Sequence, residues 1–258
     1  MKKSDIESDS WTELRSLTNA RIALGKAGSS LPTQAWLEFR LAHARARDAV
    51  WRDVDLTALE QSFKDQNLPT TTVESLAPNM QVFLRRPDLG RTLHESGNAA
   101  LRVLHKSSTS TQPIVTIIVS GGLSAVAVEN HALPTTQSLT VALNAKGIAV
   151  DHVVLVRHGR VAIGDPIGHA LGAAATIMLI GERPGLDSPD SLGAYLTFAP
   201  SPGKSDADRN CVSNIHGRGL SPEAAAHKLA WLASEALVRQ LSGVALKDES
   251  PALSTTST

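Results

Sequence analysis

Three segments hold residue types and spacings that could bind a ligand, and each follows a predicted strand or lies among the late loops. They cover residues 157–161 (RHGRV), 181–186 (GERPGL) and 206–215 (DADRNCVSNI). Together they supply arginines, a histidine, acids, turn-forming glycines and the single cysteine. In open α/β sheets, ligands settle beyond the carboxyl ends of the strands. The segments therefore predict a ligand crevice, and well-capped loops with solvated charges are the alternative.

Familiar catalytic motifs are incomplete in this sequence. The turn at 120–124 (SGGLS) lacks the spacing of a dinucleotide fingerprint or a phosphate loop. It is similar to the nucleophile elbow G-x-S-x-G, but Val126 stands where that motif has its final glycine. We therefore interpret Ser124 as a helix N-cap, with a hydrolase nucleophile as the weaker alternative. His94 and Glu95 have no second histidine at the spacing of a zinc-binding helix.

The composition excludes several classes of function. The 258 residues hold 25 Lys and Arg against 25 Asp and Glu, one cysteine, and only 3% aromatics. Zero net charge argues against a field-driven nucleic-acid binder, and few aromatics argue against a base-stacking platform. One cysteine excludes an internal disulfide and a Cys-rich zinc site. No apolar run reaches the roughly 20 residues that span a bilayer, and the N-terminus has no apolar signal region. We expect a soluble, cytoplasmic protein.

The elements that must position these segments divide at a polar stretch, residues 107–113 (SSTSTQP), which is the predicted linker. Before it, we predict a helix with Thr33 as N-cap that runs to about residue 51, helices at 56–67 and 88–105, and short extended structure at 73–84. After it, we predict buried strands at 113–119, 152–157, 175–180 and 194–198. Helices are predicted at 124–131, at 135–146 with Gly147 as C-cap, from 164, and at 221–241.

This order predicts an α/β fold, in which a helical N-terminal region precedes a doubly wound, mostly parallel sheet with helices on both faces. The predicted division is a flexible N-terminus at 1–16, a helical domain at 17–106, the linker at 107–113, a sheet domain at 114–246 and a flexible tail at 247–258.

Many short motifs in a fixed order carry a family resemblance. They lie at residues 20–22 (ARI), 25–28 (GKAG), 43–48 (HARARD), 85–91 (RRPDLGR), 122–124 (GLS), 159–161 (GRV), 181–185 (GERPG), 188–192 (SPDSL) and 208–215 (DRNCVSNI). Over about residues 17–243, the chain closely resembles the small (light) subunit of ethanolamine ammonia-lyase.

The resemblance implies a carbon–nitrogen lyase that splits ethanolamine into acetaldehyde and ammonia with adenosylcobalamin. It further implies a TIM-barrel large subunit that holds the substrate and most catalytic groups. The small subunit would join its helical region to a Rossmann-like domain that closes over the cofactor at the subunit interface. The family's cobalamin keeps its own base on cobalt. The sequence agrees, because it lacks the D-x-H-x-x-G motif that replaces that base: Asp151 and His152 are adjacent.

The resemblance places cofactor contacts on Val161, Glu182 and Cys211, one in each of the three segments. Backbone groups at Val161 and Cys211 could serve the amides that fringe the corrin, and the Glu182 carboxylate could accept their N–H bonds. We expect Cys211 to pack rather than react, and acid–base work to lie in the large subunit. Arg160 and Arg183 could steer cofactor amides or phosphate, or pair across the interface.

The chain departs from the family pattern at two points. Gly121 stands where relatives often carry an aspartate, which removes one acceptor from that turn. About sixteen residues precede the resembling region, so packaging into a bacterial microcompartment is in doubt. We expect the Arg-rich helix at 36–51 to contact a large subunit or a neighbouring protomer. The alternative functions are a non-catalytic cobalamin-binding or solubilising scaffold module and, weakest, a hydrolase that uses Ser124.

Overall fold

The computed structural model describes residues 9, 11–18, 20–107 and 111–251, and these build a mixed α/β fold around a six-stranded sheet. The strand order is β1-β3-β2-β4-β5-β6. The strands are β1 Thr70–Glu74, β2 Val115–Ser120, β3 Val153–Arg157, β4 Ala175–Gly181, β5 Leu192–Phe198 and β6 Arg209–Ile215. The pairs β1–β3, β3–β2 and β2–β4 are parallel, whereas β4–β5 and β5–β6 are antiparallel. The predicted α/β class with a mostly parallel sheet is confirmed.

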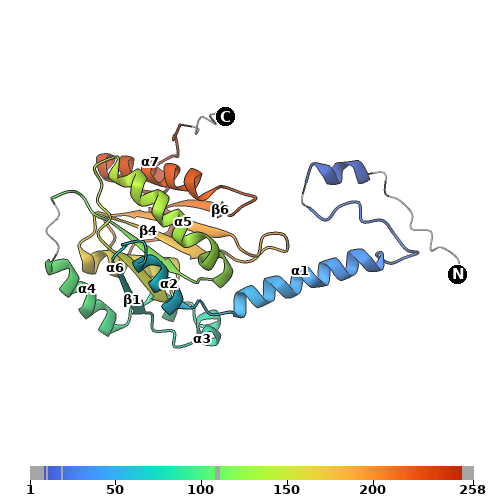
Figure 1. Ribbon diagram of the computed structural model, residues 1–258, viewed down its shortest axis with the longest axis horizontal. Coiled ribbons are helices and arrows are strands. Elements are labelled where there is room, and N and C mark those ends of the chain that lie inside the picture. The colour runs from blue at the N-terminus through green and yellow to red at the C-terminus, as the bar shows by residue number, and fades with distance from the viewer. Residues whose placement is uncertain (1–8, 10, 19, 108–110, 252–258) are drawn as a thin grey trace.

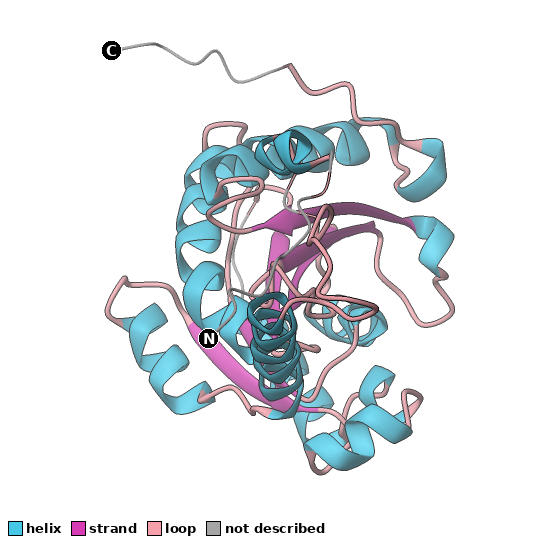
Figure 2. Ribbon diagram, turned by 90° about the vertical axis from the view of Figure 1, so that its right-hand side faces the viewer, coloured by secondary structure: helices cyan, strands magenta, loops and turns pink. Residues whose placement is uncertain are grey.

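Helices cover both faces of this sheet (Figures 1 and 2). The α-helices are α1 Thr33–Trp51, α2 Leu56–Lys64, α3 Met80–Arg85, α4 Glu95–Ser107, α5 Ala125–Asn144, α6 Gly164–Leu171 and α7 Pro222–Arg239. Helices α2, α5 and α7 bury Phe63, Leu139 and Leu229 against one face. Helices α4 and α6 bury Leu101 and Ile167 against the other. The central strands are mostly apolar because both of their faces are covered, and every residue of β2 and β4 is buried.

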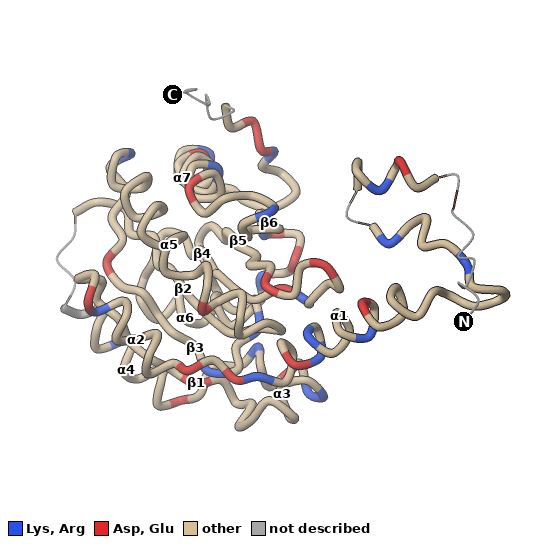
Figure 3. The backbone as a smooth tube through the Cα atoms, turned by 45° about the vertical axis from the view of Figure 1, so that its right-hand side comes forward, with Lys and Arg blue, Asp and Glu red and all other residues tan. Residues whose placement is uncertain are grey.

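Helix α1 differs from the others because it projects from the body as an arm (Figure 1). It buries only small residues, Ala42 and Ala49. Its large apolar side chains are exposed: Trp36, Leu37, Phe39, Leu41 and Trp51. Figure 3 shows charges of both signs along the same helix. The base of the arm is fixed by an ion pair between Arg52 and Glu129 of α5, with 2.7 Å between Nη2 and Oε2.

Several predicted elements are corrected. Pro32 occupies the cap position of α1, so Thr33 is the first helical residue rather than the N-cap. The extended structure predicted at 73–84 is strand β1 at its start and helix α3 at its end. Asn79 begins α3 by accepting the Val82 N–H at 3.0 Å. The helix predicted at 88–105 starts at Glu95, after a 3-10 turn at Leu89–Arg91.

Two further corrections concern the sheet region. The two helices predicted at 124–131 and 135–146 are one helix, α5, which continues through Pro134 because both halves pack in the same core. Gly147 lies beyond the end of that helix with a left-handed φ of +71°. The segment at 206–215 is not a loop: a 3-10 turn at Asp206–Asp208 leads directly into strand β6.

The sheet draws on both sides of the predicted linker, because β1 precedes residues 107–113 and pairs with β3. The centre of that linker (108–110), most of the predicted flexible N-terminus (1–8 and 10) and the end of the predicted tail (252–258) lie outside the described residues. Within the part of the chain that the structure describes, no helix is both long and apolar enough to cross a membrane.

Candidate functional site

A hollow of about 420 Å³ lies beyond the carboxyl ends of β2, β3 and β4. Its walls include Phe83, Arg160, Val161, Glu182, Arg183 and Tyr195. Two of the three predicted segments, at 157–161 and 181–186, therefore meet at one place. They do so because β3 and β4 are parallel to β2 on either side of it, so their carboxyl ends share one edge of the sheet.

The turn after β2 forms one wall of the hollow and depends on a glycine. Gly122 has a left-handed φ of +56°, and a Cβ there would lie 2.4 Å from the Gly181 carbonyl oxygen. The Leu123 N–H donates to that same oxygen at 2.9 Å. The neighbouring Gly121 faces the segment after α1, where an added Cβ would lie 2.8 Å from Val54 Cγ2. A side chain at position 121 therefore requires Val54 to move.

Val161 is held at the start of a 3-10 turn, Val161–Ile163, by contacts of the loop before it. The Arg160 N–H donates to the Gly90 carbonyl at 2.8 Å. The Ser120 hydroxyl accepts the Gly159 N–H at 3.0 Å and lies 3.0 Å from the Val156 carbonyl oxygen. The end of β2 thus fixes the loop after β3, and Val161 lines the hollow.

Glu182 follows β4 and uses one of its two carboxylate oxygens within the chain. Oε2 accepts the Ser191 hydroxyl and, at 3.3 Å, the Asn214 N–H. Oε1 lies over Gly193, where a Cβ would come within 2.9 Å of it. Among the described residues, Oε1 has no hydrogen-bond donor of its own. This carboxylate is therefore oriented by β5 and β6 and keeps one acceptor for a ligand.

Cys211 is one step removed from the other two predicted contacts. It lies on β6 opposite Tyr195 of β5, and Tyr195 rather than Cys211 lines the hollow. The residue is exposed overall, but burial still raises the pKa of its thiol. Burial, followed by the neighbouring Cys211, raises the pKa of Tyr195 in turn. The thiol is therefore protonated at neutral pH, which does not suit a nucleophile.

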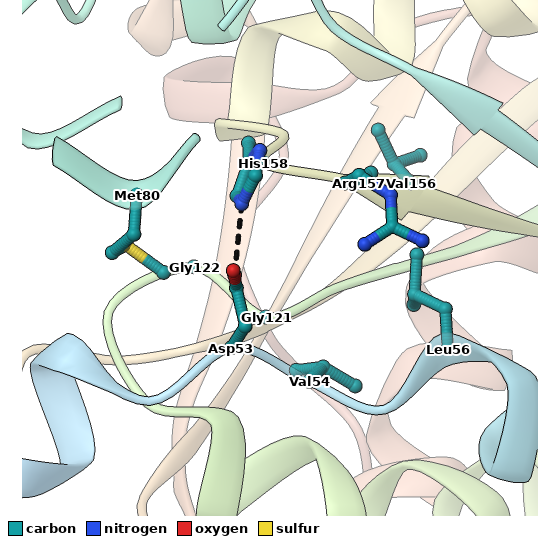
Figure 4. Close-up of a pocket in the computed structure, with 9 residues that line it drawn as sticks. All are labelled: Asp53, Val54, Leu56, Met80, Gly121, Gly122, Val156, Arg157 and His158. Carbon is teal, nitrogen blue, oxygen red and sulfur yellow. Dashed lines mark hydrogen bonds and ion pairs between the residues drawn. The ribbon is translucent and has the colours of Figure 1, made fainter. Parts of the chain in front are cut away.

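Sequence reasoning missed the bridge that ties this edge of the sheet to the segment after α1 (Figure 4). His158 is buried with a left-handed φ of +52°. Its Nε2 lies 2.8 Å from Asp53 Oδ1, and its Nδ1 lies 3.0 Å from the Ala77 carbonyl oxygen. The gap between them is about 10 Å³, too small for a ligand. The bridge therefore positions the loop that carries Arg160 and Val161. The flagged segment contained His158, but nothing in the sequence paired it with Asp53.

The remaining chemical candidates have structural roles. Ser124 caps α5 by accepting the Ala127 N–H at 3.2 Å, and its hydroxyl donates to the Pro189 carbonyl at 2.7 Å. The N-cap interpretation of Ser124 is confirmed. Within residues 9, 11–18, 20–107 and 111–251, no group of three or more His, Cys, Asp or Glu side chains is placed to hold a metal ion.

A family model for the ethanolamine ammonia-lyase light chain matches residues 8–247. The chain belongs to this family. The ethanolamine ammonia-lyase small subunit of Azotobacter vinelandii is 49% identical over 247 residues, which cover 96% of this chain and 91% of that protein. The small subunits of Bradyrhizobium diazoefficiens and of Pseudomonas putida strain W619 are each 50% identical, over 92% and 93% of this chain and 90% and 88% of their own lengths. The family resemblance drawn from the motifs is confirmed, and the matched region of the light-chain family includes the whole hollow.

Proposed function

We propose that this chain is the small subunit of an adenosylcobalamin-dependent ethanolamine ammonia-lyase and that it closes over the cofactor at the interface with a large subunit. The observation that carries the proposal is the hollow at the strand ends, where Val161 and Glu182 lie together. Homologues named as small subunits of this lyase support the activity and the larger partner.

The residues of the hollow fit a corrinoid. Its fringe of amides needs hydrogen-bond acceptors, and Glu182 keeps Oε1 for one of them. The Nε of Arg160 is buried and has no hydrogen-bond acceptor in the described chain, so a ligand acceptor could satisfy it. The hollow of about 420 Å³ is smaller than a whole corrinoid. The remainder of the cofactor is therefore left for the large subunit to cover.

The chain's own share of the work is positioning. When bound, the cofactor supplies the radical chemistry. Glu182 and the Val161 backbone would hold amides of the corrin fringe, and the walls of the hollow would exclude water from that side. Ser124 is occupied as a cap and the Cys211 thiol is neutral, so we assign no catalytic residue to this subunit. The exposed apolar side chains of α1 support assembly with a large partner.

The test is cofactor titration of the complex of both subunits carrying Glu182→Ala, followed by visible absorbance. Loss of a charge-assisted hydrogen bond, worth about 1.5–3 kcal/mol, should weaken adenosylcobalamin binding about ten- to a hundred-fold with assembly intact. Glu249→Ala, an exposed acid outside the hollow, is the control. Unchanged affinity would refute the assignment. Turnover by the small subunit alone would refute the proposed division of labour, and assembly with no gain in turnover would favour a scaffold.

A further inference from the structure

The guanidinium of Arg160 is held rigidly at the edge of the hollow. It lies over the ring of Phe83, 4.5 Å from the ring centre, and its Nη2 donates to the Phe83 carbonyl at 2.9 Å. Its Cγ packs so closely on Gly90 that a Cβ there would lie 3.0 Å away. The side chain is half-buried, and its Nε is buried without an acceptor in the described chain. Such pre-organisation favours recognition of a planar or tetrahedral anion.

No acid neutralises this guanidinium within the described residues. Arg160 forms no ion pair there. Burial lowers the pKa of Arg160, and the charge of Arg91 lowers it further. Glu182 shares the hollow, but its carboxylate is oriented by Ser191 and Asn214.

The buried Arg209 shows a contrast in charge compensation, although its Nε, like that of Arg160, has no hydrogen-bond partner in the described chain. Arg209 is compensated by two hydrogen bonds to the Asp165 carboxylate, at 2.7 and 2.8 Å. The fold therefore supplies a carboxylate where a guanidinium is buried for structural reasons, and it supplies none at Arg160. An uncompensated, partly desolvated cation at a ligand hollow indicates that the counter-charge arrives with the ligand.

We propose that Arg160 binds the phosphodiester in the nucleotide loop of the cofactor. The inference rests on the proposed function, because the hollow must first take a corrinoid. The phosphodiester is the anionic group at the periphery of adenosylcobalamin, whose other peripheral groups are neutral amides. Arg160 directly precedes Val161, so an anion on its guanidinium and an amide on the Val161 backbone belong to one ligand surface.

The test compares two corrinoids on the complex of both subunits. Adenosylcobinamide lacks the phosphodiester and the base, whereas adenosylcobalamin has both. In Arg160→Gln, the Kd for adenosylcobalamin should rise about ten- to a hundred-fold while the Kd for adenosylcobinamide stays unchanged. Adenosylcobinamide phosphate carries a phosphate group, so the same substitution should raise its Kd as well. Arg183→Gln is the matched control, because it removes an exposed arginine from the same hollow. It should change the Kd values of all three corrinoids by the same factor.

Phosphorus NMR provides a readout that does not depend on turnover. The resonance of the bound phosphodiester should shift in Arg160→Gln and stay in place in Arg183→Gln. Equal losses of affinity for adenosylcobalamin and adenosylcobinamide in Arg160→Gln, or an unmoved phosphorus resonance, would overturn the inference. Such a result would indicate that Arg160 pairs with a carboxylate of the large subunit instead. If Arg160→Gln does not fold, Arg160→Lys, which keeps the charge but loses the planar fork of donors, must show the same selective loss in weaker form or the inference fails. If the wild-type complex binds no corrinoid at all, the proposed function fails first.

Discussion

The ion pair between Asp165 and Arg209 permits a quantitative test of how this fold is held together. It joins α6 to the first residue of β6, and the two side chains are only 4% and 3% exposed. Nη1 and Nη2 of Arg209 lie 2.7 and 2.8 Å from the two carboxylate oxygens. These hydrogen bonds raise the pKa of Arg209 despite its burial. Asp165→Asn removes the negative charge with almost no change in shape and leaves the guanidinium buried.

The expected loss follows from the partners that remain. Removing one member of a buried pair destabilises a protein by about 3–5 kcal/mol, because an uncompensated charge is left behind. Arg209 keeps the Thr197 hydroxyl at 3.0 Å, the Lys204 carbonyl at 3.4 Å and the exposed Asp206 carboxylate at 3.6 Å. We therefore expect a value near the lower limit, about 3 kcal/mol. For a chain of this size, each kcal/mol lowers Tm by about 2–4 °C, so Tm should fall by about 6–12 °C.

Urea titration and thermal melting, both followed by circular dichroism, measure this loss. The chain offers a matched control in Asp206, whose carboxylate lies 3.6 Å from Arg209 Nε but is 91% exposed. Asp206→Asn should change the free energy of unfolding by less than about 1 kcal/mol, because an exposed pair is screened by water. Equal effects of the two substitutions, or a loss below about 1 kcal/mol for Asp165→Asn, would refute the reasoning.

One further substitution and one chemical modification test the roles assigned to Ser124 and Cys211. Ser124→Ala removes the cap on the Ala127 N–H and should lower the free energy of unfolding by about 1 kcal/mol. Turnover of the proposed lyase complex should not change. Loss of turnover in a folded complex would mean that Ser124 takes part in catalysis. Cys211 should react with iodoacetamide more slowly than free cysteine at pH 8. Because burial raises its pKa, the thiolate forms only above the ordinary range and the rate should keep rising with pH, so a faster rate than free cysteine would contradict that shift.

The sequence predicts an element correctly where the residues of that element alone indicate its structure. The apolar run at 113–119 has no alternative to burial on both faces, and it forms β2. Ser221 followed by Pro222 begins α7 as predicted, and the Ser221 side chain accepts the Ala224 N–H at 3.2 Å. Strand β6 escaped prediction because its buried residues, Arg209, Val212 and Ile215, recur every third position rather than every second, and one of them is charged. Its pairing with the antiparallel strand β5 is not visible in the sequence.

The candidate site was predictable in part for the same reason. Val161 and Glu182 follow parallel strands, so the rule that places ligands at the carboxyl ends of strands brings them together. Cys211 lies mid-strand on β6, and the register with Tyr195 that sets its place cannot be read from composition. The bridge from His158 to Asp53 joins residues 105 positions apart, a contact that only the finished sheet creates.

The position of β1 in the sheet sets an order on the folding of the nascent chain. The ribosome makes β1 before every other strand, but its parallel partner β3 comes only after β2 and the whole of α5 have been made. Until then β1 presents unpaired N–H and C=O groups, which are a template for pairing with another chain. Strand β1 can therefore join the sheet only after β3 has been made. The early segment that carries α1 and β1 is the part most exposed to proteases and to misassembly during synthesis.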